Sequence, residues 1–159
     1  YLLGEHLDID SRSVHAFIIG EHGDSEVAAW SITNIAGMSM KSFFEHYGKC
    51  TDEDLQAMYS EVKNSAYEII QKKGATYYAI ATAVARIVEC ISGGENSVLT
   101  ISSVLNGEYG IEDISLSIPT QVSGYGVERI LDVPFNEIEL QGLRSSAKTL
   151  KDSLKSIGF

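Results

Sequence analysis

The chain has 159 residues and a formal net charge of −10, with 44% hydrophobic and 21% charged residues. This length and composition suit one globular domain with a sizeable core. The acidic balance, without a cluster of Lys and Arg, argues against nucleic acid or an anionic membrane surface as a partner. No apolar run approaches the roughly 20 residues of a membrane-spanning helix, and no stretch resembles a secretory leader. We therefore expect a cytoplasmic protein.

Two cysteines and the first residues give further expectations. Cys50 and Cys90 form no CxxC motif, and we interpret both as free thiols of a reducing compartment. A disulfide or a catalytic cysteine is the alternative. The chain starts at Tyr1 rather than at a methionine, and residues 1–5 read like the end of a helix. We therefore expect a fragment of a longer protein.

The first third of the chain contains a short apolar run at residues 14–19, which predicts a buried strand. Alternation along a strand would place His15, Phe17 and Ile19 on one face. Residues 26–37 are ambiguous between a strand and a short helix, and a short helix is expected near residues 39–47.

Two helices are predicted next. Thr51 and Asp54 resemble a capping box, and an apolar stripe at helical spacing then continues to Ile70. Gly74, after two lysines, ends this helix. A second helix, at about residues 76–91, is rich in alanine. Because small side chains allow close packing on several sides, we expect this helix to be central in the fold.

Residues 97–134 change from helical spacing to the alternation of side chains that is typical of strands. Alternating segments within residues 97–134, separated by turns at Asn106 and Gly124, predict short antiparallel strands. Asn136 and Glu139 cap a final helix with one apolar face. The fold class is α+β, with long helices packed on an antiparallel sheet. The dinucleotide fingerprint GxGxxG is absent, so no Rossmann domain is expected in this chain.

The most distinctive local motif is Gly-Glu-His-Gly-Asp-Ser at residues 20–25, directly after the predicted strand. A strand would hold the base of this turn rigid while the turn exposes His22. Imidazole is the side chain whose unperturbed pKa lies nearest neutrality, which suits proton transfer to a small substrate. A polar turn with a surface histidine is the alternative. Zinc ligation is disfavoured because no second His or Cys lies at metal-ligand spacing, and we expect no metal site.

Gly-Ala-Thr-Tyr-Tyr at residues 74–78 joins the two predicted helices. Thr76 either caps the second helix or offers its hydroxyl to a substrate oxygen. His15 on an apolar strand is typical of a core or interface histidine.

Together these segments resemble the C-terminal, substrate-binding half of bacterial-type NAD-dependent L-lactate dehydrogenases, within the lactate/malate dehydrogenase family. The resemblance covers essentially residues 1–159. Its most specific stretches are GEHGDS at 20–25 and KKGATYY at 72–78, supported by YLLGE at 1–5, the run from Ser65 to Ile80, and NGEYG at 106–110.

The resemblance implies roles for individual residues. His22 matches the catalytic histidine, which donates a proton to the pyruvate carbonyl oxygen and accepts one from the lactate hydroxyl. Thr76 matches a threonine of the substrate pocket, and Tyr67 a tyrosine near that pocket. Ile80 matches the apolar residue that packs on the nicotinamide ring of NAD.

The family also places residues outside this chain. Its histidine-orienting aspartate, its substrate-binding arginine and its Rossmann domain match positions upstream of Tyr1. We therefore expect the isolated fragment to have little or no turnover, because it lacks most of the groups that bind the transition state.

Regulation follows from the same resemblance. Many bacterial members are homotetramers activated by fructose 1,6-bisphosphate, and His15 matches the phosphate-contacting histidine at their subunit interface. Relatives without this control also carry a histidine here, so allostery stays open.

Two alternatives to lactate are a malate dehydrogenase and a dehydrogenase for longer L-2-hydroxy acids. A different class of protein, a non-catalytic oligomerisation module, is the remaining alternative. The match along the whole chain favours a lactate dehydrogenase.

Overall fold

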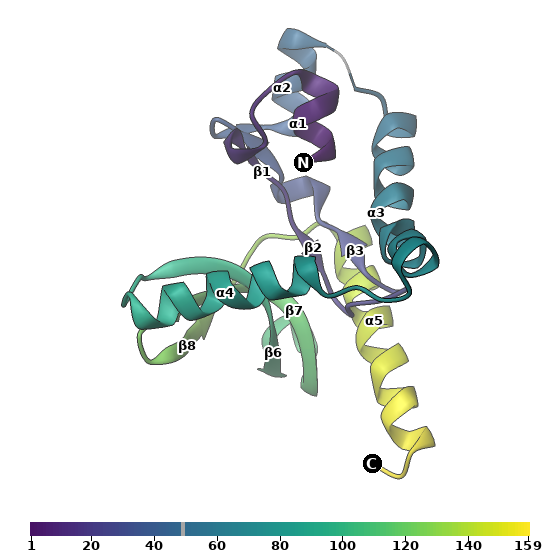
Figure 1. Cartoon of the computed structure of the whole chain (residues 1–159), viewed down its shortest axis with the longest axis vertical. Helices are drawn as coiled ribbons and strands as arrows, with labels where there is room; N and C mark the ends of the chain where they lie inside the picture. Colours follow the sequence, from purple (N-terminus) through teal and green to yellow (C-terminus); the bar gives the residue numbers. More distant parts are fainter. Residues whose placement is uncertain (49) are drawn as a thin grey trace.

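The computed structural model describes residues 1–48 and 50–159. The fold is α+β, as expected from the sequence (Figure 1). The helices are α1 (Leu2–Leu7), α2 (Met40–Tyr47), α3 (Asp52–Lys73), α4 (Tyr78–Ser92) and α5 (Glu137–Ser156). The strands are β1 (Val14–His15), β2 (Ile18–Ile19), β3 (Val27–Ala28), β4 (Asn34–Ile35), β5 (Met38–Ser39), β6 (Ser97–Asn106), β7 (Glu112–Ser123) and β8 (Gly126–Ile130). Within the described ranges, no helix combines the length and the apolar character that crossing a membrane requires.

The main sheet is antiparallel, with strand order β6-β7-β8. β6 and β7 pair along nearly their whole length, and β7 is the central strand. The turn predicted at Asn106 lies at the end of β6, and the turn predicted at Gly124 joins β7 to β8. The prediction of antiparallel pairing is therefore confirmed, but β6 and β7, with 10 and 12 residues, are not the short strands expected.

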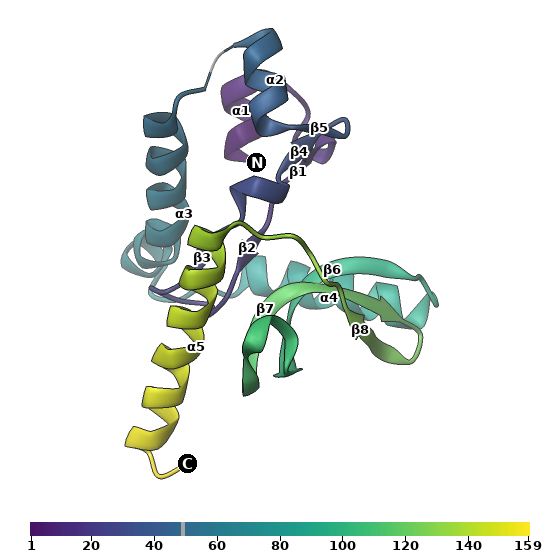
Figure 2. The same ribbon diagram turned by 180° about the vertical axis from the view of Figure 1, so that it is seen from behind.

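The hydrophobic core lies between β7, the first half of α5 and the short strands β2 and β3. Ile118 on β7, Ile19 on β2 and Leu143 on α5 are each fully buried in it. Figures 1 and 2 show α5 leaving the sheet beside β3 and extending away from the rest of the chain. The C-terminal half of α5 is accordingly exposed.

The expectation of a single strand at residues 14–19 is wrong. The run divides into β1, which pairs with β4, and β2, which pairs with β3. Ala16 and Phe17 lie between them, so the strict alternation expected for one face does not hold. His15 is exposed and Ile19 is buried. The ambiguous stretch at residues 26–37 contains β3, a 3-10 helix (Trp30–Ile32) and β4.

Both predicted capping boxes are present, Thr51 with Asp54 at the start of α3 and Asn136 with Glu139 at the start of α5.

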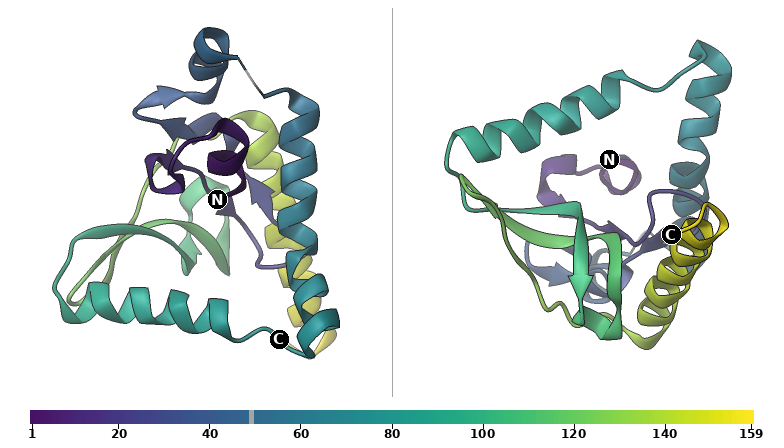
Figure 3. Two further views of the ribbon diagram at one scale, coloured as in Figure 1. Left: turned by 45° about the horizontal axis from the view of Figure 1, so that its top comes forward. Right: turned by 90° about the horizontal axis from the view of Figure 1, so that it is seen from below.

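The expectation that the alanine-rich helix, α4, is central is wrong. Cys90 is the only buried residue of α4, and its Sγ lies 3.5 Å from the carbonyl oxygen of Val122 on β7. Figure 3 shows α4 meeting the sheet at its C-terminal end only. Small side chains permit close packing, but among the described residues α4 meets the sheet only where Cys90 lies against β7 and through Arg86, which donates to Ser97 of β6 at 3.3 Å.

Candidate functional site

The β2–β3 loop, residues 20–26, presents His22. Gly20 anchors its start on the main sheet, because its N–H donates to the Ser117 carbonyl and its carbonyl accepts from the Ser117 N–H, each at 2.8 Å. Gly20 has φ +93°, and a Cβ at this position would lie 2.7 Å from Oγ of Ser146 on α5. Only glycine fits this backbone conformation and this close approach.

The loop is also braced from within. The Glu21 carboxylate accepts hydrogen bonds from the Ser25 N–H, at 3.2 Å, and from the Ser25 hydroxyl. The Glu26 N–H donates to the Gly23 carbonyl at 3.1 Å. His22 lies at the exposed tip of this closed turn. The predicted arrangement, an exposed imidazole on a turn whose backbone is held in place, is therefore present.

Helix α3 holds one side of the loop. Lys63 Nζ donates to the Asp24 carbonyl oxygen at 2.6 Å, and the Tyr67 hydroxyl donates to Asp24 Oδ1 at 3.2 Å. Tyr59 donates to the Glu26 carbonyl. Figure 1 shows β3 and its loop between α3 and α5.

Helix α5 holds the other side through Ser146, which is fully buried. Its Oγ accepts the Glu21 N–H at 2.5 Å and lies 3.3 Å from Ser25 Oγ. One hydroxyl therefore contacts the residue before His22 and the end of the turn. Neither Ser146 nor Lys63 belongs to a recognisable sequence motif, so only the fold identifies them as parts of the site.

Two ionisable groups near His22 are perturbed. Burial raises the pKa of Glu26, while the positive charges of Lys63 and His22 oppose that rise. The negative charge of Asp24 and the hydrogen bond to it raise the pKa of Tyr67. The carboxyl group of Glu26 is therefore close enough to His22 for their charges to interact.

The other predicted residues are not gathered around His22. Tyr67 reaches the loop through Asp24. Thr76 lies in the connection between α3 and α4, and Ile80 is 56% exposed on α4. In the part of the chain that the structure describes, no hydrogen bond joins Thr76 to His22. The capping interpretation of Thr76 is wrong, because the N-cap of α4 is Tyr77 and no side-chain cap bond is made there.

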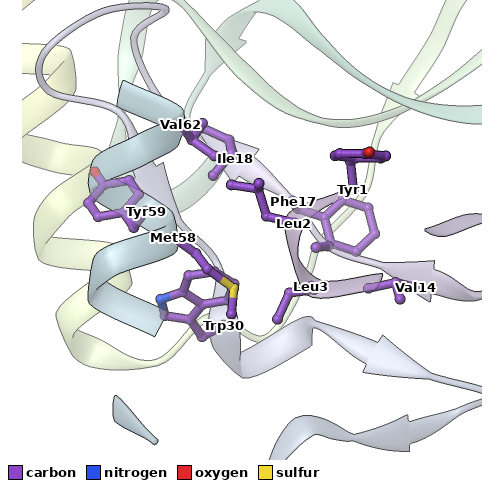
Figure 4. A pocket seen from close by; sticks show the side chains of 11 residues that line it. Tyr1, Leu2, Leu3, Val14, Phe17, Ile18, Trp30, Met58, Tyr59 and Val62 are labelled. Atoms are coloured by element: carbon purple, nitrogen blue, oxygen red, sulfur yellow. The ribbon is translucent and has the colours of Figure 1, made fainter. Parts of the chain in front are cut away.

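A separate apolar pocket of about 270 Å³ lies between α1, β2 and α3 (Figure 4). Leu2, Ile18, Trp30, Met58 and Val62 are among its lining residues. His22 does not line it, so the pocket is separate from the histidine loop.

The fold and the histidine loop define a class of protein. The model of the lactate/malate dehydrogenase family, alpha/beta C-terminal domain, matches residues 1–158, and the chain belongs to this family.

Its relatives are more specific. The chain is 55% identical over 158 residues to the L-lactate dehydrogenase of Acetivibrio thermocellus, covering 99% of this chain and 50% of that protein. It is 54% identical to L-lactate dehydrogenase 1 of Clostridium acetobutylicum, with the same coverage. The chain thus spans about half the length of the curated relatives it matches.

Solved structures agree with this assignment. The minor L-lactate dehydrogenase of Enterococcus mundtii, in its ligands-bound form, superposes with a TM-score of 0.93 at 42% identity, over 98% of this chain and 50% of that one. MGS-M5, a lactate dehydrogenase from a deep-sea metagenome library, gives a TM-score of 0.95 at 38% identity, over 99% of this chain and 50% of that one.

Proposed function

We propose that residues 1–159 form the substrate-binding and catalytic domain of an NAD-dependent L-lactate dehydrogenase, which interconverts (S)-lactate and pyruvate. The observation that carries the proposal is the exposed His22 on a loop held by α3, α5 and β7, in a chain of this family. The names of the matched relatives favour lactate over malate as substrate.

His22 acts as the general acid and base. Its imidazolium donates a proton to the carbonyl oxygen of pyruvate, and its neutral imidazole accepts the proton of the lactate hydroxyl. The loop fixes the backbone of His22 while the ring stays exposed to substrate. Proton transfer needs this combination of a backbone held in place and an accessible ring nitrogen.

Tyr67 and Thr76 contribute to the substrate pocket, and Ile80 contacts the cofactor. The apolar, exposed side chain of Ile80 fits the nicotinamide end of NAD, whereas the chain has no Gly-rich loop for the pyrophosphate. NAD, when bound, supplies or accepts the hydride. An apolar contact at Ile80 excludes water from the path of that transfer.

Further proposals concern assembly and regulation. We propose a cytoplasmic homotetramer in which His15 contacts fructose 1,6-bisphosphate. His15 is exposed on β1, which leaves its ring accessible to a phosphate at a subunit interface.

The test uses the complete polypeptide that carries this domain. NADH oxidation is followed with pyruvate, oxaloacetate and 2-oxoisocaproate, with and without fructose 1,6-bisphosphate. The variants are His22→Ala and, as a matched control, His46→Ala, which removes an exposed histidine of α2. We expect pyruvate to be preferred, His22→Ala to lower kcat about 10²–10⁴-fold, and His46→Ala to match the wild type.

The other outcomes have distinct meanings. Preference for another oxo acid would retain the mechanism and change the substrate. Turnover that survives His22→Ala would refute the role of His22. A half-saturation for pyruvate that does not respond to the bisphosphate would refute the regulatory role of His15.

A further inference from the structure

Three metal-ligating side chains from two separate segments of the chain converge at the start of α3. They are His6 in the last turn of α1, Cys50 just before α3, and Asp54 in the first turn of α3. One ligand atom from each lies within 4.8 Å of the other two. His6 Nε2 and Asp54 Oδ2 are 3.9 Å apart. Asp54 is about 20 Å along the helix axis from Tyr67, so the cluster is remote from the loop of His22.

We propose that His6, Cys50 and Asp54 bind a Zn²⁺ ion. An imidazole nitrogen, a thiolate sulfur and a carboxylate oxygen are the three ligand types that zinc takes in proteins. Tetrahedral bonds of about 2.0–2.3 Å place ligand atoms roughly 3.3–3.8 Å apart. The cluster reaches this geometry if the separations between its ligand atoms, which are at most 4.8 Å, shorten by about 1.5 Å or less, and water takes the fourth position.

The surroundings orient one of the ligands, Asp54. The Thr51 N–H and hydroxyl hold Asp54 Oδ2, at 2.8 and 3.0 Å, as part of the capping box. The Cys50 thiol donates to the Thr51 carbonyl oxygen at 3.7 Å, a bond that it gives up when it binds a metal as a thiolate. The hydrogen bonds to Asp54 restrict the position of that ligand and raise the affinity of a metal site.

Charge and exposure also suit a cation. The first turn of α3 carries Asp52, Glu53 and Asp54, which outweigh the partial positive charge of the helix N-terminus. The side chains of His6 and Asp54 are 32% and 40% exposed, so an ion can enter from solvent. The bound ion would tie α1 to α3 and stabilise the native state.

Sequence spacing gives no sign of this site. His6 is far in the chain from Cys50 and Asp54, and no motif of regularly spaced ligands exists. Only the fold brings His6 to the other two positions.

The experiment titrates the untagged chain with Co²⁺ and Zn²⁺ in the presence of a reductant that contains no thiol. Co²⁺ reports a thiolate ligand by its charge-transfer absorption, and competition with a chromogenic chelator gives the Zn²⁺ affinity. We expect one equivalent to bind and the melting temperature to rise. We expect Cys50→Ser to abolish the thiolate band and to weaken Zn²⁺ binding at least tenfold. His6→Gln should weaken binding similarly, whereas His46→Gln, on exposed α2, should leave it unchanged.

Two results would overturn the proposal: no thiolate band in the wild type, or a band that persists in Cys50→Ser. Because Cys90 is present in every variant, a persistent band would identify that thiol as the ligand. A measurement without any variant guards against misfolding. Zn²⁺ should protect Cys50 of the wild-type chain from alkylation, and equal alkylation with and without Zn²⁺ would also refute the site. None of these readouts depends on dehydrogenase activity.

Discussion

At the scale of single residues, the loop of His22 depends on Ser146. This buried hydroxyl on α5 contacts Glu21 and Ser25, which flank the histidine on both sides. A methyl group at the same position would keep the packing but leave the Glu21 N–H without its acceptor. Ser146 is therefore a positioning residue for the proposed reaction.

We predict that Ser146→Ala lowers kcat of the complete enzyme about tenfold or more while KM changes little, because small displacements of a reacting group are costly. Ser145→Ala is the matched control, since Ser145 is the exposed neighbour on the same helix. Steady-state kinetics and the pH profile of kcat are measured for both variants. An equal effect of the two substitutions, or an effect on stability alone, would contradict the positioning role.

Glu26 is a second residue whose environment has a measurable consequence. Its Oε1 is buried and has no hydrogen-bond partner in the described part of the chain. Burial raises its pKa, against the opposing charges of Lys63 and His22 and with a smaller contribution from Asp24. The folded state therefore holds this proton more tightly than the unfolded state does.

The sign of the pH effect follows. The contribution of protonated Glu26 to the free energy of unfolding is fully present below the ordinary pKa of glutamate. It is lost as pH rises through the higher pKa of the folded state. We predict that Glu26→Gln removes this decline and stabilises the chain near neutral pH by about 1 kcal/mol or less. Chemical denaturation at several pH values measures it, with Glu61→Gln on the exposed surface of α3 as control. Loss of stability at neutral pH would show that the charge of Glu26 is needed.

At the scale of elements, the contact of α5 with β3 depends on a glycine within the helix. A Cβ on Gly142 would lie 2.8 Å from Cγ2 of Val27. Helix propensity favours Ala over Gly by about 1 kcal/mol, but the close approach of α5 to β3 leaves no room for the methyl group.

We predict that Gly142→Ala destabilises the chain by about 1–3 kcal/mol through overpacking. Val27→Ala in the Gly142→Ala background should recover part of the loss, because it removes the atoms that clash. A double-mutant cycle by chemical denaturation isolates this coupling. Additive effects of the two substitutions would mean that α5 moves away from β3 instead.

The capping boxes show what local sequence can predict and what it cannot. Thr51 with Asp54 and Asn136 with Glu139 both follow from spacing, and both are present. Glu139 is also buried and accepts hydrogen bonds from the N–H and the hydroxyl of Ser31, which lies more than a hundred positions earlier. The helix start was predictable, but its attachment to the N-terminal half of the chain was not.

At the scale of the whole molecule, the helices differ sharply in burial. In α5, Glu139, Leu143, Ser146 and Ala147 are buried, whereas α4 buries Cys90 alone. Ile80, Val84 and Val88 of α4 are each more than half exposed. The first turns of α4 therefore have few tertiary contacts to stabilise them.

We predict that amide hydrogens in the first half of α4 exchange faster than those in the first half of α5. Regions with few buried contacts open locally at low free energy. Hydrogen exchange of the 159-residue chain, read by mass spectrometry over both helices, tests this difference. Equal protection of the two helices would show that another surface covers α4 in solution.

The sequence by itself determined the class of fold, the two capped helices, the antiparallel strands after residue 97 and the prominence of His22. These features depend on side-chain periodicity and on contacts three or four residues apart, which are visible along the chain. Tertiary structure decided the rest: the division of residues 14–19 between two sheets, the exposed position of α4, the support of the histidine loop by Ser146 and Lys63, and the meeting of His6 with Cys50 and Asp54. Each of these depends on which distant segment lies opposite, and that is settled only when the chain buries its core.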